Sequence, residues 1–236
     1  TIFAQHEPEN NMSDYGGNYG GLEGWGALQQ AAATIVRSKG RSELRFGPCF
    51  MGPWTWDSRS PYYTWINQWG QVMDWSLFDV IGIDPYATIH PGGFSLQQML
   101  TVRNSGSGSG NSSVKSMMAW LAEWDIPIVV AEWGYYRKQA QDHGVYDMPV
   151  DPIPDAVVAS WIRDAYEWAK TWNTTHLPRL ENGRVKGAFI DAMSWFNYSL
   201  LGTDCPLTGP LAAPTTVGLK IDAYRDIVID SKIPPT

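Results

Sequence analysis

The sequence predicts an α/β fold of the barrel type, because strand-like runs alternate with helical patterns along the whole chain. The segments after the strands are long and rich in Gly, Pro and aromatic residues, whereas those after the helices are short. This difference is typical of a barrel in which one rim carries the functional loops. With 236 residues, 44% of them hydrophobic, we expect residues 1–236 to belong to one barrel domain.

The strands are predicted from short apolar runs rich in β-branched and aromatic residues, at 1–6, 43–50, 78–84, 126–131 and 186–193. The helices are predicted from apolar residues at helical spacing, at 22–38, 61–75, 112–124, 154–173 and 217–229. Each helix follows a strand, which indicates parallel β/α units. The Ser- and Gly-rich tract 104–111 predicts a loop without chemistry of its own.

Charge and composition narrow the class of partner. A net charge of -7 argues against nucleic acid and anionic membranes, whose binding depends on Lys and Arg. The sequence contains no uncharged apolar run of about 18 residues, so we expect no insertion into a membrane. No Cys/His spacing indicates a metal site and no glycine-rich loop follows a strand, so we expect no cofactor. Cys49 and Cys205 are interpreted as buried free thiols, with a disulfide as the alternative.

Aromatic residues are unusually frequent, with 13 Trp, 11 Tyr and 7 Phe. Aromatic faces stack on the apolar faces of sugar rings, so this composition favours a saccharide ligand. Five tryptophans fall in predicted helices and are expected to be structural: Trp120, Trp124, Trp161, Trp168 and Trp172. Four follow strand ends and are candidates for substrate binding: Trp54, Trp56, Trp133 and Trp195.

Two glutamates end apolar strands, Glu7 after the first predicted strand and Glu132 after 126–131. Parallel strands bring their carboxyl ends to one rim, where two carboxylates can face each other across a pocket. Such a pair is what a retaining glycosidase needs. Glu9 is the rival acid, because alternating side chains place it on the face of Glu7, although Pro8 is expected to end the strand between them.

Three segments carry a resemblance to a known family: His6-Glu7-Pro8-Glu9-Asn10, the run 78–86 ending in Asp84-Pro85-Tyr86, and the run 127–134 ending in Glu132-Trp133-Gly134. In this order they resemble the ends of strands four, six and seven in the retaining glycosidases built on a (β/α)8 barrel. The closest likeness is to family 26 of the glycoside hydrolases, chiefly endo-β-mannanases with some β-glucanases.

The resemblance implies roles for individual residues. Glu7 is the expected acid/base, Glu132 the nucleophile, Trp195 the aromatic floor beneath the reacting sugar, and Tyr86 a hydrogen-bonding group near the nucleophile. His6 orients Glu7 or contacts sugar hydroxyls, with a structural role as the alternative. Asn10 is the expected substrate contact, although the family often has Asn-Gly after the acid/base where this chain has Pro8-Glu9-Asn10-Asn11.

If Glu7 ends strand four, this chain covers about strands 4 to 8 of the barrel, and the first three β/α units lie upstream. We expect roughly 80 to 120 further residues there, or another chain that completes the barrel. The expected location is extracellular, either secreted or on a virion surface. The competing interpretations are a catalytically weak or inactive carbohydrate-binding or adhesion module, and, last, a scaffold without a ligand.

Overall fold

The computed structural model describes residues 2–4, 21–40, 44–51, 73–84, 86–88, 96–101, 117–136, 155–195, 199–200 and 203–204. Its helices are α1 (Gly21–Ser38), the short 3₁₀ helix η3 (Trp75–Leu77), α3 (Leu96–Thr101), α4 (Met117–Glu123) and α5 (Asp155–Thr175). The parallel strands are β1 (Ile2–Ala4), β2 (Leu44–Phe46), β3 (Cys49–Met51), β4 (Ile81–Asp84), β5 (Tyr86–Thr88), β6 (Ile128–Tyr136) and β9 (Ile190–Trp195). β1 and β2 form one sheet, and the other five strands form a second. Two hairpins complete the described elements, β7 (Arg179–Glu181) with β8 (Arg184–Lys186), and β10 (Ser199–Leu200) with β11 (Thr203–Asp204).

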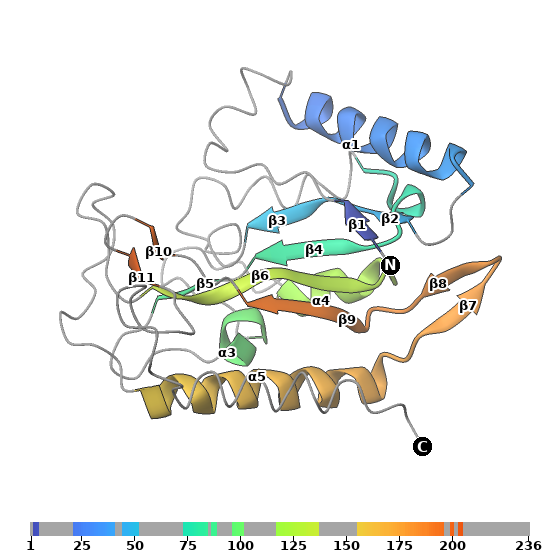
Figure 1. Ribbon diagram of the computed structural model, residues 1–236. Helices are drawn as coiled ribbons and strands as arrows, with labels where there is room; N and C mark the ends of the chain where they lie inside the picture. Colours follow the sequence, from blue (N-terminus) through green and yellow to red (C-terminus); the bar gives the residue numbers. More distant parts are fainter. Residues whose placement is uncertain are drawn as a thin grey trace, which may run out of the picture.

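The parallel strands lie side by side in chain order, except that β5 pairs with the last residues of β6 (Figure 1). β1 pairs with β2, β3 with β4, β4 with β6, and β6 with β9. Segment 44–51 joins the two parts, because Phe46 O and Pro48 O accept from Asp79 N and Gly82 N at 2.9 and 2.8 Å. A doubly wound sheet reverses its strand order at a switch point, whereas a barrel does not. The observed order confirms the predicted α/β class, and the closed barrel stays a prediction.

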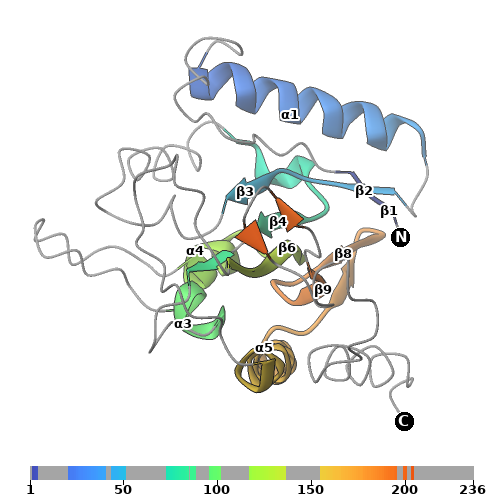
Figure 2. The same ribbon diagram turned by 60° about the vertical axis from the view of Figure 1, so that its left-hand side comes forward.

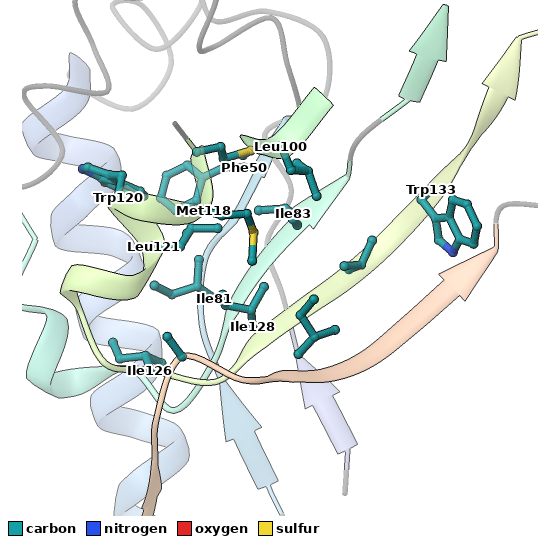
Figure 3. Close-up of a cluster of buried hydrophobic side chains, with 14 of the residues drawn as sticks. Phe50, Ile81, Ile83, Leu100, Met118, Trp120, Leu121, Ile126, Ile128 and Trp133 are labelled. Carbon is teal, nitrogen blue, oxygen red and sulfur yellow. The ribbon is translucent and has the colours of Figure 1, made fainter. Parts of the chain in front are cut away.

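Helices α1, α4 and α5 are arranged around the strands and cover the same face of the sheet (Figure 2). Apolar side chains that alternate along the strands point to these helices: Phe50, Ile81, Ile83, Ile128, Val130 and Ile190. Figure 3 shows several of them packed against Met118, Trp120 and Leu121 of α4. The five tryptophans expected to be structural all belong to this core or pack against it, so that prediction is confirmed.

Three tryptophans, Trp75, Trp120 and Trp124, form a compact cluster around η3. The ring of Trp75 stacks on Trp124 with centroids 4.7 Å apart and meets Trp120 edge to face at 5.4 Å. Phe50 of β3 contacts Trp120 at 5.8 Å, which joins the cluster to the sheet. Pairs of this geometry contribute about 0.5–1.5 kcal/mol beyond their burial. The cluster therefore fixes α4 and η3 against the strands that lead to the carboxyl edge.

Two neighbouring glutamines of α1 differ in their bonding and support a prediction about stability. Gln29 is 1% exposed, and neither its Nε2 nor its Oε1 has a hydrogen-bond partner within the described part of the chain. Gln30 instead accepts a bond from Asp74 N at 2.8 Å. Because an unsatisfied buried amide costs about 1–3 kcal/mol, we expect Gln29→Met to raise the free energy of unfolding and Gln30→Met to lower it by about 1 kcal/mol. Thermal unfolding of both variants measures the difference, and a lower melting temperature for Gln29→Met contradicts it.

The last turn of α5 holds the first residues of β9 in place. Trp172 Nε1 donates to Ala188 O at 2.6 Å. Asn173 bonds both backbone groups of Ile190: its Nδ2 donates to Ile190 O at 2.9 Å, and its Oδ1 accepts from Ile190 N at 2.7 Å. The side-chain amide thus acts as a short neighbouring strand, because the pairing of Ile190 with β6 leaves these backbone groups unused. These hydrogen bonds fix the position at which β9 begins. They therefore also influence the register of the following residues of β9 against β6.

The amino-terminal edge of the sheet is held by charged groups. Asp79, directly before β4, accepts from Arg184 at 2.7 Å and lies 3.5 Å from Arg37. Burial, followed by the nearby charge of Arg184, lowers the pKa of Arg37 from its ordinary value. Arg179 donates a bidentate pair to Asp125, and this hydrogen bonding raises the pKa of Arg179. In a barrel this edge serves stability, which leaves the opposite edge for function.

Several predicted elements need correction. The strand predicted at 43–50 is two strands, because the chain breaks at Gly47-Pro48, and the strand predicted at 186–193 is broken at Gly187, where φ is +112°. α3 was not predicted, since its six residues are too short for a periodic signal. The connection from α5 to β9 is not short, because it contains the β7–β8 hairpin. The predicted helix 217–229 and most of 61–75 lie outside the described residues.

Candidate active site

The carboxyl ends of the parallel strands gather at one edge of the sheet, opposite the charged edge described above (Figure 1). β1 ends at Ala4, three positions before Glu7, and Glu132 is the middle residue of β6. β1 and β6 are separated by the segment 44–51 and by β4. Because all these strands run in the same direction, the chain leaves β1 toward the edge at which Glu132 lies.

Glu132 occupies a bulge in β6. Val130 pairs with Met193 and Trp133 with Trp195, so Ala131 and Glu132 together lie opposite the single residue Ser194. A bulge re-aims the side chains of the strand that contains it, and bulges are over-represented beside active sites. The backbone at the predicted nucleophile is thus locally irregular, and the same strand pair has a second register shift between Ile128 and Val129.

Two other predicted site residues are brought to the same place by strand pairing. Tyr86 begins β5 and lies opposite Gly134, two positions beyond Glu132. Trp195 ends β9 opposite Trp133, one position beyond Glu132. The backbones of residues 86, 132 and 195 therefore meet at one part of the carboxyl edge, although they come from three separate predicted segments. The sequence predicts that these segments lie close together, and the strand pairing shows which of their residues lie opposite one another.

Trp133 has a different environment from the one expected. Its side chain is 7% exposed and belongs to the hydrophobic core (Figure 3). The bulge explains this position, because the extra residue in β6 puts Trp133 on the same face as Val130. The ring is thus part of the packing against the helices, and its contact with a substrate stays a prediction. The remaining predicted site residues, His6, Glu7, Glu9, Asn10, Trp54 and Trp56, lie outside the described residues.

An ion pair that the sequence did not reveal crosses the face of the sheet away from the core. Arg45 Nη2 of β2 donates to Asp191 Oδ2 of β9, and the two residues are 146 positions apart. Asp191 lies within the predicted strand 186–193. No sequence pattern linked it to Arg45, because only the curvature of the sheet brings the two strands together.

The described part of the chain contains no candidate metal site and no candidate membrane-spanning helix. In the described ranges no group of three or more His, Cys, Asp or Glu side chains is placed to hold a metal ion. None of the helices in these ranges combines the length and apolar character needed to cross a membrane. Cys49 is buried and not in a disulfide, as predicted, and Cys205 lies outside the described residues.

Comparison with known proteins gives only distant similarities. No protein-family model matches the sequence, and no curated protein matches it. Among solved structures, the chain is similar to a fungal β-1,4-galactanase, with 14% identity, a TM-score of 0.44, and coverage of 80% of this chain and 51% of the galactanase. It is also similar to an exo-β-1,3-glucanase of glycoside hydrolase family 128 from Cryptococcus neoformans, with 13% identity, a TM-score of 0.40, and coverage of 82% and 56%. The chain thus spans about half the length of these two structures, and similarity at this level carries no conclusion about activity.

Proposed function

We propose that this protein is a retaining glycoside hydrolase that cleaves a β-linked polysaccharide of the mannan or β-glucan type within the chain. The observation that carries the proposal is the position of Glu132 on the backbone, in a bulge of β6 near the carboxyl edge of the sheet, the same edge at which β1 ends. Active sites of (β/α) barrels lie at this edge, and their catalytic residues come from the ends of different strands. Polysaccharide substrates of this kind imply an extracellular location.

The chemistry divides between the two glutamates. Glu132 attacks the anomeric carbon and forms a glycosyl-enzyme ester, while Glu7 gives its proton to the departing glycosidic oxygen. Glu7 then takes a proton from water, which attacks the same carbon and releases Glu132, so the configuration is retained. This sequence requires carboxyl groups about 5–5.5 Å apart and a pKa of Glu7 that is raised until the proton has left.

Aromatic and polar residues around the pair complete the proposal. Tyr86 donates a hydrogen bond near Glu132, and Trp195 forms the floor beneath the reacting sugar. Trp54 and Trp56 are proposed as further substrate contacts. His6 and Asn10 contact the sugar hydroxyls or orient Glu7. In this proposal β5 and β9 serve to bring residues 86 and 195 to the two sides of β6.

The test is hydrolysis by the intact protein of β-mannan and of mixed-linkage β-glucan. We expect new reducing ends, a fall in viscosity that precedes most of their release, and the β-anomer as the first product seen by proton NMR. First appearance of the α-anomer would contradict double displacement. Binding of the polysaccharide without any release of reducing ends would select the carbohydrate-binding alternative.

A further inference from the structure

The β7–β8 hairpin extends from the amino-terminal edge of the sheet, away from the parallel strands (Figure 1). Its charged side chains bind it to the body of the protein. Arg184 donates to Asp79, and Arg179 donates a bidentate pair to Asp125. Because side chains alternate along a strand, Leu180 of β7 lies on the other face of the hairpin. The hairpin is thus held to the protein by its polar face.

The apolar face of the hairpin is open to solvent. Leu180 is 76% exposed, and Val185, directly opposite on β8, is 39% exposed. Leu177, just before β7, is 65% exposed. An antiparallel pair ordinarily packs its apolar face on the core and turns its charges to water, and this hairpin does the reverse. Apolar residues that gather on one exposed surface are typical of a contact site.

β7 is the outer strand of the hairpin, and among the described strands it pairs only with β8. Gly187 N, just after β8, donates to Asp125 O at 3.1 Å, so the outer edge of β8 is turned toward the main sheet. In a hairpin with a two-residue turn, the residues that flank the turn form a hydrogen-bonded pair and the next pair does not. Leu180 and Val185 are that next pair, so the backbone N–H and C=O of Leu180 point away from β8. Such an edge can pair with another strand.

The sequence of β7 is complementary to itself. When two β7 strands pair in antiparallel orientation with Leu180 opposite its own copy, Arg179 of each strand lies opposite Glu181 of the other. Opposite charges in facing positions stabilise an antiparallel pair. The side chains of Arg179 and Glu181 are 51% and 56% exposed, so a second strand can reach both of them. A second copy of this chain therefore fits the edge in charge as well as in apolar character.

The pairing closes after two copies. A two-fold axis through the Leu180 pair makes the contact isologous, with the same residues on both sides. Pro178, directly before β7, has no N–H and limits extension of the pairing toward Leu177. The hairpin lies at the edge opposite the carboxyl ends of the parallel strands, so pairing leaves both candidate active sites open.

We propose that this protein forms a two-fold symmetric dimer, in which β7 pairs with β7 of a second copy and the two hairpins make one antiparallel sheet. The paired edge is short, and the contact is therefore smaller than a stable interface, which buries about 1,200–2,000 Å². A weak dimer follows, with an expected dissociation constant of about 0.1 mM. The dimer does not depend on the proposed activity.

The test is sedimentation velocity of the intact protein between about 10 µM and 1 mM, together with hydrogen exchange at the Leu180 amide by NMR. We expect the sedimentation coefficient to rise with concentration and the amide to become protected over the same range. Glu181→Lys sets like charges opposite each other twice, and should raise the dissociation constant by about tenfold or more. Leu180→Pro removes an N–H that points away from β8, and should abolish the dimer while the hairpin remains.

Two variants serve as matched controls. Glu167→Lys makes the same change of net charge on an exposed glutamate of α5, and Leu177→Ser removes an exposed leucine outside the strand. Both should dimerise as the unmodified protein does. The proposal is overturned if the protein is monomeric at about 1 mM, if Glu181→Lys and Glu167→Lys have equal effects, or if Leu180→Pro still dimerises. Protection of the Leu180 amide in a protein that stays monomeric would show that another segment of the chain covers the edge, and would also overturn it.

Discussion

Glu132→Gln is expected to reduce hydrolysis by about 10⁴-fold or more, because the amide cannot attack the anomeric carbon and no covalent intermediate forms. A loss of this size is about 5.5 kcal/mol of transition-state stabilisation. The substitution preserves the shape of the side chain, so polysaccharide binding and the melting temperature should stay close to those of the unmodified protein. Reducing-sugar release and binding, measured on the same preparation, separate the two effects.

Glutamates at other positions provide the controls for this experiment. Glu7→Gln should lose about 10²–10⁴-fold on polysaccharides, and much less on aryl glycosides, whose leaving groups need little protonation. Glu9→Gln tests the rival acid and should retain activity. Glu181→Gln changes an exposed glutamate of β7, at the opposite edge of the sheet, and should have no effect. Full activity of Glu132→Gln, or loss only in Glu9→Gln, contradicts the assigned roles.

Gly47→Ala is expected to lower the free energy of unfolding more than any other substitution that adds a single methyl group in the described part of the fold. A Cβ built at Gly47 lies 1.7 Å from Val80 O and 2.7 Å from Val80 C. Both atoms belong to the backbone directly before β4, so no side-chain rotation relieves the overlap. Separating the strands breaks the approach of segment 44–51 to β4, and we expect a loss of about 4 kcal/mol or failure to fold.

Gly40 is the matched control for this substitution. It lies two residues after the end of α1 with φ of +64°, and a Cβ there meets nothing within 4 Å. Gly40→Ala therefore adds only the strain of the left-handed conformation, about 1–2 kcal/mol. For a chain of this size, 1 kcal/mol corresponds to roughly 2–4 °C in melting temperature. Thermal unfolding followed by tryptophan fluorescence should show a shift for Gly47→Ala at least twice that of Gly40→Ala, and equal shifts contradict the steric argument.

The elements that could be predicted are those with a strong local signal. α1 and α5 were predicted within two residues at each end, since long apolar periodicity marks a helix. β6 begins two residues later than predicted and runs on to Tyr136, because its upper part gains pairing with β5. The β7–β8 hairpin was missed although Asn182-Gly183 carries its signal: both residues have positive φ, 51° and 76°, as a tight hairpin turn requires.

The candidate site divides in a similar way. The placement of Glu132 on a buried strand is readable from the chain, because an apolar run followed by Glu-Trp-Gly is a local pattern, although β6 continues beyond Glu132 to Tyr136. The bulge at Glu132 is not, since it is defined by which residues of β9 lie opposite. The burial of Trp133 follows from that bulge, and so no reading of the local sequence could have assigned its ring to the core.

The amino-acid sequence by itself determined the α/β class, the alternation of strands and helices, and the placement of an acidic residue on β6, because each of these depends on spacing within one segment. Only the tertiary structure decided the chain-order sheet, the paired bulges of β6 and β9, and the contact of Arg45 with Asp191. These features arise from contacts between residues far apart in the chain, whose geometry is set by sheet curvature and register.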